Sequence, residues 1–194
     1  MPFNGIELTG IFASYLLGSL CTGYYLIRFF ANKDIREYGS KGVGARNVGR
    51  LLGKKGFILT LFGDTLKGVI AVAAARYLGF SAAALGLVVI AVIAGHVWPV
   101  TLGFRGGKGV ATSLGAFLIY DYRFIVLLAI TTALSMIVLR RLTLSGLVGY
   151  ALFPLIVMVL GYPVTAIYTA WLGSLLVLYA HRDNIRQVFR RGSS

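Results

Sequence analysis

The sequence contains few of the residues that form disulfides or bind metals. Cys21 is the one cysteine among 194 residues, so the chain offers neither an internal disulfide nor a cysteine-based metal site. Six residues are acidic, and they are spread along the chain rather than grouped as the ligands of a metal ion are. We therefore expect no metal site, and a magnesium-dependent phosphotransferase is disfavoured.

Apolar residues make up most of the chain. They account for 58% of it, and the mean hydropathy of +0.82 exceeds that of an ordinary soluble domain. Apolar runs cover 6–30, 57–80, 82–100, 109–120, 124–139, 144–161 and 164–180. The two short runs, 109–120 and 124–139, can tilt, lie partly buried or join into one bent unit. We predict an all-α polytopic integral membrane protein with about seven transmembrane helices, within a range of five to seven.

The net charge of +13 indicates orientation in a membrane rather than nucleic-acid binding, because no soluble domain is available to present a basic face. With the N-terminus outside, the inward segments are 31–56 (with Arg28), 101–108, 140–143 and the tail from 181. They hold 16 of the 19 lysines and arginines. Since these residues gather in cytoplasmic loops, the charges predict an outside N-terminus and a cytoplasmic C-terminus.

A glycine-rich basic loop follows the third apolar run, within GHVWPVTLGFRGGKG (95–109). Its candidate ligand-binding residues are Arg105, Gly106, Gly107, Lys108 and Gly109. Fixed positive charge beside backbone N–H groups suits a phosphate at the start of a helix near Gly109. The loop is not a nucleotide P-loop, because Leu102 replaces the first glycine and Gly109 replaces the hydroxyl residue after the lysine.

A second donor-rich loop lies at 37–50, with the sequence EYGSKGVGARNVGR. Its candidate anion-binding residues are Gly39, Ser40, Lys41, Gly42, Gly44, Arg46 and Asn47. The alternative is an ordinary basic loop that only fixes the topology. The absence of a carboxylate between residues 38 and 50 favours anion binding.

A third polar cluster, HRDNIRQVFRR (181–191), follows the last apolar run. His181 and Asn184 lie three residues apart and share a face if the helix continues. With Arg182 they would stand at the interface where a soluble anion meets an acyl chain. The alternative is a basic tail that binds anionic lipid, which is the role we expect for Arg190 and Arg191.

Four further polar residues lie in or beside apolar runs. Asp64 and Lys67 stand inside a span, where charge is expensive, and their i,i+3 spacing predicts an ion pair with a structural or secondary role. His96 is a candidate substrate-binding residue or base, but a structural hydrogen bond to a loop carbonyl is the favoured role. Ser145, with Thr143 nearby, offers a hydroxyl to the substrate or simply begins a helix.

Together the three clusters resemble the cytoplasmic motifs of the bacterial acyl-phosphate:glycerol-3-phosphate acyltransferases, the PlsY family. GSKGVGARN (39–47) is similar to the first motif, with Gly42 and Arg46 in place of the usual Asn and Thr. GHVWPVTLGFRGGKGVAT (95–112) matches the second motif almost throughout. HRDNI (181–185) matches the start of the third.

The resemblance implies transfer of a fatty acyl group from acyl phosphate to the 1-hydroxyl of glycerol 3-phosphate, giving lysophosphatidic acid and inorganic phosphate in phospholipid biosynthesis. It implies no metal, no cofactor and no covalent enzyme intermediate. Lys108, Arg46, Ser40 and the loop N–H groups would bind phosphate and stabilise the oxyanion. His181 and Asn184 would orient glycerol 3-phosphate. The proton acceptor is a substrate phosphate or His181.

The resemblance places the protein in the bacterial cytoplasmic (inner) membrane, with the active site facing the cytoplasm and the lipid bilayer around it. We expect one membrane-embedded domain over 1–191, a monomer that suffices for activity, and a tail added by cloning at 192–194. The alternative function is a transporter or flippase for a phosphorylated solute or lipid. Only Asp64 and Lys67 resemble the midplane site that a transporter needs.

Overall fold

The computed structural model describes residues 3–191, which form helices joined by short turns and include no strand. The helices are α1 (Gly5–Gly18), α2 (Thr22–Ala31), α3 (Ala45–Tyr77), α4 (Ala82–Val97), α5 (Val110–Tyr120), α6 (Tyr122–Leu139), α7 (Leu142–Val159), α8 (Val164–Ala180) and α9 (Arg182–Arg191). Two 3-10 turns, η1 (Ile35–Glu37) and η2 (Val100–Leu102), lie in loops. The predicted all-α class is confirmed, and the tail at 192–194 lies outside the described residues.

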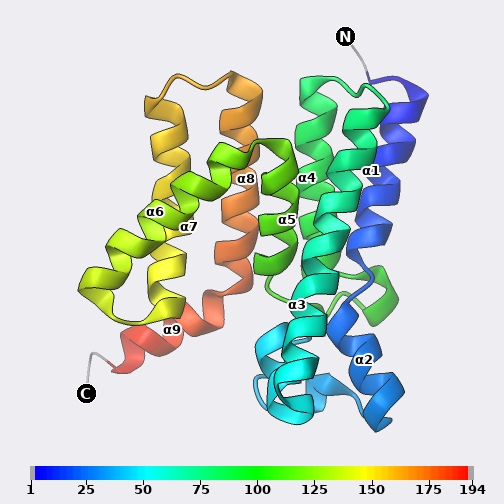
Figure 1. Cartoon of the computed structure of the whole chain (residues 1–194), viewed down its shortest axis with the longest axis vertical. Helices are drawn as coiled ribbons and strands as arrows, with labels where there is room; N and C mark the ends of the chain where they lie inside the picture. The colour runs from blue at the N-terminus through cyan, green and yellow to red at the C-terminus, as the bar shows by residue number, and fades with distance from the viewer. Residues whose placement is uncertain (1–2, 192–194) are drawn as a thin grey trace.

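Apart from α2, which continues in the direction of α1, successive apolar helices point in alternating directions along the bundle (Figure 1). Among the described residues, five segments are long and apolar enough to cross a membrane: Gly5–Ala31, Ala45–Tyr77, Ala82–Leu102, Tyr122–Leu139 and Leu142–Val159. The apolar helices α5 and α8 are shorter. α5 ends before the level at which α4 and α8 begin (Figure 1). The predicted range of five to seven spans is confirmed.

The two short runs between 109 and 139 form separate helices rather than one bent unit. Asp121 separates α5 from α6, and its side chain accepts a hydrogen bond from the backbone N–H of Arg123, which caps α6. α6 has 18 residues, packs against α7 and crosses it obliquely (Figure 1). Three buried rings with centroids 5.3 to 5.7 Å apart join α5, α6 and α7: Phe117, Phe124 and Phe153.

The first apolar run, 6–30, is broken, although its hydropathy predicts one continuous span. α1 ends at Gly18 and α2 begins at Thr22. Ser19 still donates its N–H to the carbonyls of Tyr15 and Leu16, at 3.0 and 3.1 Å, before the helical ladder stops. The break leaves backbone carbonyls inside an apolar bundle, where they need partners from the protein because water is scarce.

α3 is kinked near its start. Gly53 has φ 64° and ψ −162°, a backbone conformation that a residue with a Cβ rarely adopts. It divides α3 into a short first part and a long span. The first part carries Arg46 and Arg50 and lies at the same end of the bundle as α2 and α9 (Figure 1).

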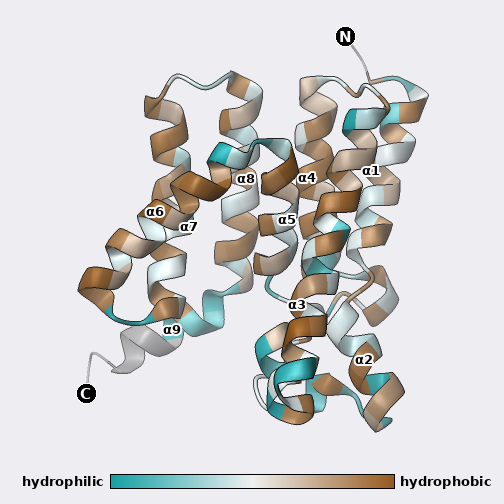
Figure 2. Ribbon diagram, in the orientation of Figure 1, coloured by the Kyte–Doolittle hydropathy of each residue, from teal (hydrophilic) through white to brown (hydrophobic). Residues whose placement is uncertain are grey.

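Hydrophilic residues gather at that end of the bundle (Figure 2). We call it the basic end and define it by residues 31–56, 101–109, 140–143 and 181–186. α1 begins at the opposite end, and α9 lies at the basic end (Figure 1). The fold therefore brings the three polar clusters of the sequence to one end of the bundle, which agrees with the single membrane face that their charges predict.

Candidate active site

The basic end brings Lys108, in the loop before α5, to Asn184, in the first turn of α9. The Lys108 ammonium is half-buried and donates a hydrogen bond to Asn184 Oδ1. Gly109, with φ 76°, precedes α5 and has no side chain that could cap the helix. The first backbone N–H groups of α5 therefore have no side-chain cap, and they lie directly after Lys108 in the chain. An ammonium beside the N-terminus of a helix attracts anions. The second and third motifs therefore form one site.

His181 is buried where α8 meets α9. Its Nδ1 lies 2.8 Å from the Val177 carbonyl oxygen, so Nδ1 carries the proton and Nε2 is left as a hydrogen-bond acceptor. Burial lowers the pKa of His181, and the charges of Lys108 and Arg46 lower it further, against the opposing effect of the Val177 hydrogen bond. His181 is therefore neutral at pH 7 and can accept a hydrogen bond from a hydroxyl group.

Two arginines on the short first part of α3 extend the positive cluster. Arg46 Nη1 donates a hydrogen bond of 2.7 Å to Thr143 Oγ1, which ties α3 to the start of α7. Burial lowers the pKa of Lys108, and the charges of Arg46 and Arg50 lower it further, so both guanidinium groups act on the ammonium. A phosphate dianion bound among these three cations would relieve their mutual repulsion.

Sequence reasoning missed Arg50, and of the two hydroxyl groups that it offered, those of Ser145 and Thr143, the one that contacts Arg46 is that of Thr143. Arg50 follows Arg46 by four residues, and this spacing on a helix indicates a shared face. Ser145 is fully buried, and its hydroxyl donates to the Arg141 carbonyl oxygen at 3.1 Å. Thr143 lies one half-turn earlier on α7, where its hydroxyl reaches Arg46.

The glycines of the loop before α5 do not offer all their N–H groups to a ligand, contrary to the sequence-based prediction. Gly106 donates its N–H to the Val97 carbonyl at 3.2 Å, and Gly107 donates to the His96 carbonyl at 3.0 Å. A Cβ at Gly107 would collide with the His96 ring, so glycine is required for this close approach to α4. The N–H groups that remain for an anion are those at the start of α5.

Asn47 organises the loop before α3. Its side chain is buried, and its Nδ2 donates to the carbonyls of Tyr38 and Gly42, both at 2.9 Å. Its Oδ1 accepts a hydrogen bond of 3.0 Å from the N–H of Ser40. These contacts use the amide of Asn47 to shape the loop, whereas the sequence predicts contact with an anion.

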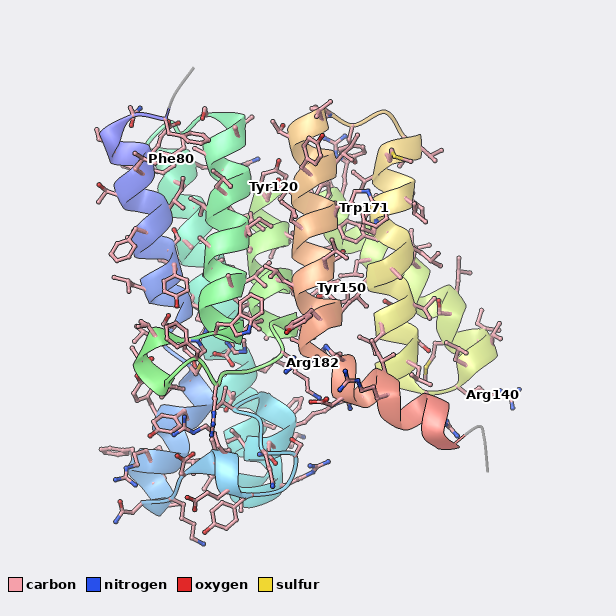
Figure 3. The ribbon with its side chains drawn as sticks, turned by 180° about the vertical axis from the view of Figure 1, so that it is seen from behind. Phe80, Tyr120, Arg140, Tyr150, Trp171 and Arg182 are labelled. Atoms are coloured by element: carbon pink, nitrogen blue, oxygen red, sulfur yellow. The ribbon has the colours of Figure 1, made fainter. Side chains whose placement is uncertain are left out.

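The other candidate residues lie in turns or on the surface of the basic end. Gly39 has φ 54°, and Gly44 precedes the first turn of α3. The exposed side chains are those of Ser40, Lys41, Arg105 and Arg182. Arg182 lies over the Tyr179 ring, 4.6 Å from its centroid, at the turn from α8 to α9 (Figure 3). Among the side chains that the structure describes, none of these four hydrogen-bonds to Lys108.

His96 is buried beneath the loop before α5, but its ring partner is not the loop carbonyl that the sequence predicts. His96 Nδ1 lies 2.8 Å from Lys67 Nζ. Lys67 Nζ in turn lies 3.2 Å from Asp64 Oδ1, which confirms the predicted ion pair. All three side chains are buried against protein partners, so the pair forms no open midplane site of the kind a transporter needs. In residues 3–191, no three His, Cys, Asp or Glu side chains are grouped as metal ligands.

Known proteins match the chain over nearly its whole length. A family model described as glycerol-3-phosphate acyltransferase matches residues 8–191. Glycerol-3-phosphate acyltransferase 1 of Desulfitobacterium hafniense (strain Y51) is 41% identical over 188 residues, which cover 97% of this chain and 93% of that protein. Glycerol-3-phosphate acyltransferase of Clostridioides difficile (strain 630) is 39% identical over 180 residues, which cover 90% and 88%.

Solved structures share the fold. A crystal structure of PlsY (YgiH), an integral membrane glycerol 3-phosphate acyltransferase, in its glycerol 3-phosphate form has a TM-score of 0.85 to this chain at 34% identity, covering 96% of this chain and 93% of that one. Its lysophosphatidic acid form has a TM-score of 0.83 at 33% identity, with the same coverage. The fold and the site define an integral membrane acyltransferase. The chain belongs to the glycerol-3-phosphate acyltransferase family.

Proposed function

We propose that this acyltransferase moves a fatty acyl group from acyl phosphate to the 1-hydroxyl of glycerol 3-phosphate, giving lysophosphatidic acid and inorganic phosphate. This would be the first acylation of phospholipid biosynthesis. The observation that carries the proposal is the convergence of Lys108, Arg46, His181 and Asn184 at the basic end. Cations, an amide and a neutral imidazole suit a dianion that also bears hydroxyl groups. The glycerol 3-phosphate and lysophosphatidic acid forms of PlsY support the same acceptor and product.

The reaction needs no covalent enzyme intermediate, because phosphate is a good leaving group. The glycerol hydroxyl oxygen attacks the acyl carbonyl carbon and forms the ester C–O bond. The bond from that carbon to the phosphate oxygen breaks, and its electron pair leaves with phosphate. The hydroxyl proton passes to a substrate phosphate, whose second pKa of about 6 suits neutral pH.

Each residue of the cluster has a part in this scheme. Lys108 and the N–H groups at the start of α5 bind a phosphate and stabilise negative charge on the acyl carbonyl oxygen. Arg46 and Arg50 bind the second phosphate. His181 accepts a hydrogen bond from the glycerol hydroxyl at Nε2, and Asn184 holds Lys108 in place, so both residues orient the reactants.

The position of the site suits substrates that arrive from two phases. We place it on the cytoplasmic side of the bacterial inner membrane, because the basic end carries most of the lysines and arginines. Glycerol 3-phosphate would then enter from water and the acyl chain from the bilayer. A monomer carries every residue that the scheme uses.

Turnover by the purified protein in detergent tests the proposal. With acyl phosphate and glycerol 3-phosphate supplied, we expect phosphate and lysophosphatidic acid to appear in equal amounts. Absence of both products would contradict the proposed reaction. A requirement for sealed vesicles would instead support transport of a phosphorylated solute.

Replacing Lys108 by alanine tests its role in that reaction. Loss of a positioned cation at developing charge lowers kcat by about 100-fold or more, so we expect at least this loss for Lys108→Ala. Lys54→Ala is the matched control, because Lys54 is an exposed lysine of the same basic end. Near-normal turnover of Lys108→Ala in a folded protein would contradict the phosphate-binding role.

A further inference from the structure

Lys67 is a buried lysine in a membrane-spanning helix, and the proposed reaction does not use it. Its side chain is 5% exposed, and that of its neighbour Asp64 is 2% exposed. Charged side chains inside a membrane are rare, because each must find partners that replace water. The partners of Lys67 therefore indicate what the charge does.

Two of these partners are carbonyls that the break between α1 and α2 leaves free. Lys67 Nζ donates to the Gly18 carbonyl at 2.8 Å and to the Leu20 carbonyl at 2.9 Å. On the other side of the break, Asp64 Oδ1 accepts a hydrogen bond of 3.2 Å from the N–H of Thr22, which opens α2. The ion pair thus satisfies backbone groups on both sides of the break, so it stabilises the interruption of the first span.

The third N–H group of the Lys67 ammonium is directed at the ring of His96. The distance from Nζ to His96 Nδ1 is 2.8 Å, and an ammonium can only donate, so Nδ1 accepts and Nε2 carries the ring proton. This fixes the tautomer and orientation of the ring. The ring lies against Gly107, whose N–H donates to the His96 carbonyl, and Lys108 is the next residue.

The broken first span also holds the loop that follows α4 directly. Thr101 Oγ1 donates to the Ser19 carbonyl inside the break at 2.9 Å. Tyr15 donates its hydroxyl to the Trp98 carbonyl at 2.8 Å. The loop before α5 is therefore hydrogen-bonded to the break between α1 and α2, whose backbone is held by Asp64 and Lys67.

We infer that Asp64, Lys67 and His96 are positioning residues that set the location of Lys108 through Gly107. The inference rests on the proposed function, in which Lys108 binds phosphate. None of the three touches the substrate; they act by holding the loop. Because misplacing a reactive group by about 1 Å lowers rates by about 100-fold, loosening this assembly affects turnover strongly.

Kinetics of matched variants test the role of the ammonium and its acceptor. We expect Lys67→Met to lower kcat/KM by about 100-fold, and Leu66→Met, a 39% exposed neighbour on the same helix, to leave it unchanged. His96→Asn keeps an acceptor near the position of Nδ1, whereas His96→Leu has a similar shape without one. Asn should therefore retain more activity than Leu. Equal activity of these two variants would overturn the role of the acceptor.

A spin label on the loop tests the same inference without turnover. Arg105→Cys places the label on an exposed residue of the loop, and the native Cys21 is fully buried and protected from labelling. We expect Lys67→Met to increase the mobility of the label and Leu66→Met to leave it unchanged. An unaltered spectrum in Lys67→Met would overturn the inference. If the label is restrained with native Lys67 and mobile in Lys67→Met, while the unlabelled protein shows no turnover, only the proposed reaction fails, so the two failures are distinguishable.

Discussion

The titratable side chains of the site act on one another through their charges. Burial lowers the pKa of Lys108, and the neighbouring charges of Arg46 and Arg50 lower it further. Burial and the same kind of positive neighbours lower the pKa of His181. A phosphate dianion beside the Lys108 ammonium opposes the shift of that group, so substrate binding favours the charged form of Lys108. His181 enters the reaction as a neutral acceptor.

Replacing His181 by glutamine separates orientation of the substrate from proton transfer. Glutamine keeps an acceptor near the position of Nε2, and we expect KM for glycerol 3-phosphate to rise about tenfold, equivalent to about 1.4 kcal/mol for a weakened hydrogen bond. Steady-state kinetics with varied glycerol 3-phosphate measure this change. The variant should keep most of kcat, because the proton acceptor is a substrate phosphate.

The pH profile of the same variant provides the control. A lowered pKa keeps His181 neutral at pH 7, and protonation as the pH falls through that pKa would remove its acceptor. The substrate phosphate also gains a proton near its second pKa of about 6, and this change is independent of His181. We expect His181→Gln to keep the fall of kcat/KM at low pH. A flat profile in the variant would show that protonation of His181, and not of the substrate phosphate, causes the fall at low pH.

At the scale of elements, helix ends rather than helix faces build the site. The C-terminal end of α4, the N-terminal end of α5 and the junction of α8 with α9 meet at the loop that carries Lys108. Hydropathy finds such helices by their apolar runs and predicts their ends within a few residues. It did not find the break at residues 19–21, because Ser19, Leu20 and Cys21 interrupt neither the apolar character nor the length of the run.

Gly107→Ala tests the close contact between the loop and α4. The added Cβ would collide with the His96 ring, and overpacking of this kind destabilises by about 1–3 kcal/mol unless the loop moves. We expect the loop to shift and kcat/KM to fall at least tenfold. Turnover and the midpoint of thermal unfolding in detergent measure the two effects.

Gly146→Ala is the matched control for that substitution. Gly146 lies in α7, and a Cβ there meets nothing within 4 Å. Alanine is also the better helix former, so this variant should keep both activity and stability. If Gly107→Ala behaved in the same way as Gly146→Ala, the loop would not depend on its contact with His96.

At the scale of the whole molecule, the basic end determines how the protein sits in the membrane. The lysines and arginines within 31–56, 101–108 and 140–143 favour the cytoplasmic side, while Arg76 and Arg123 lie near the opposite end. The start of α1 lies at the end of the bundle opposite to the basic end, so it would lie outside if the basic end is cytoplasmic, as we propose. Orientation and the position of the site are consequences of the same charges.

Labelling of introduced cysteines in intact cells tests this orientation. Arg123→Cys, at a side chain that is 61% exposed, should react with a membrane-impermeant maleimide from outside. Lys54→Cys, at the basic end, should react only after the cells are opened. The native Cys21 is fully buried and should give no background. Reaction of Lys54→Cys in intact cells would show that the orientation is opposite to the one proposed.

The sequence by itself determined the helical class, the range of spans, the end that carries the polar clusters and the motifs that contain Lys108, His181 and Asn184. Hydropathy, charge and local motifs are properties of short segments, so they are readable without a fold. Tertiary structure decided which donors face a ligand. It turned Asn47 inward and brought Thr143 to Arg46.

In the folded protein, the N–H groups of Gly106 and Gly107 also hydrogen-bond to carbonyls of α4 and hold the loop against it. Asp64, Lys67 and His96 contact one another beneath that loop. These contacts connect residues far apart in the sequence. A hydrogen bond forms only where packing brings donor and acceptor within about 3 Å and leaves no water to compete. Only the folded bundle meets that condition, because no single segment of the sequence contains both partners.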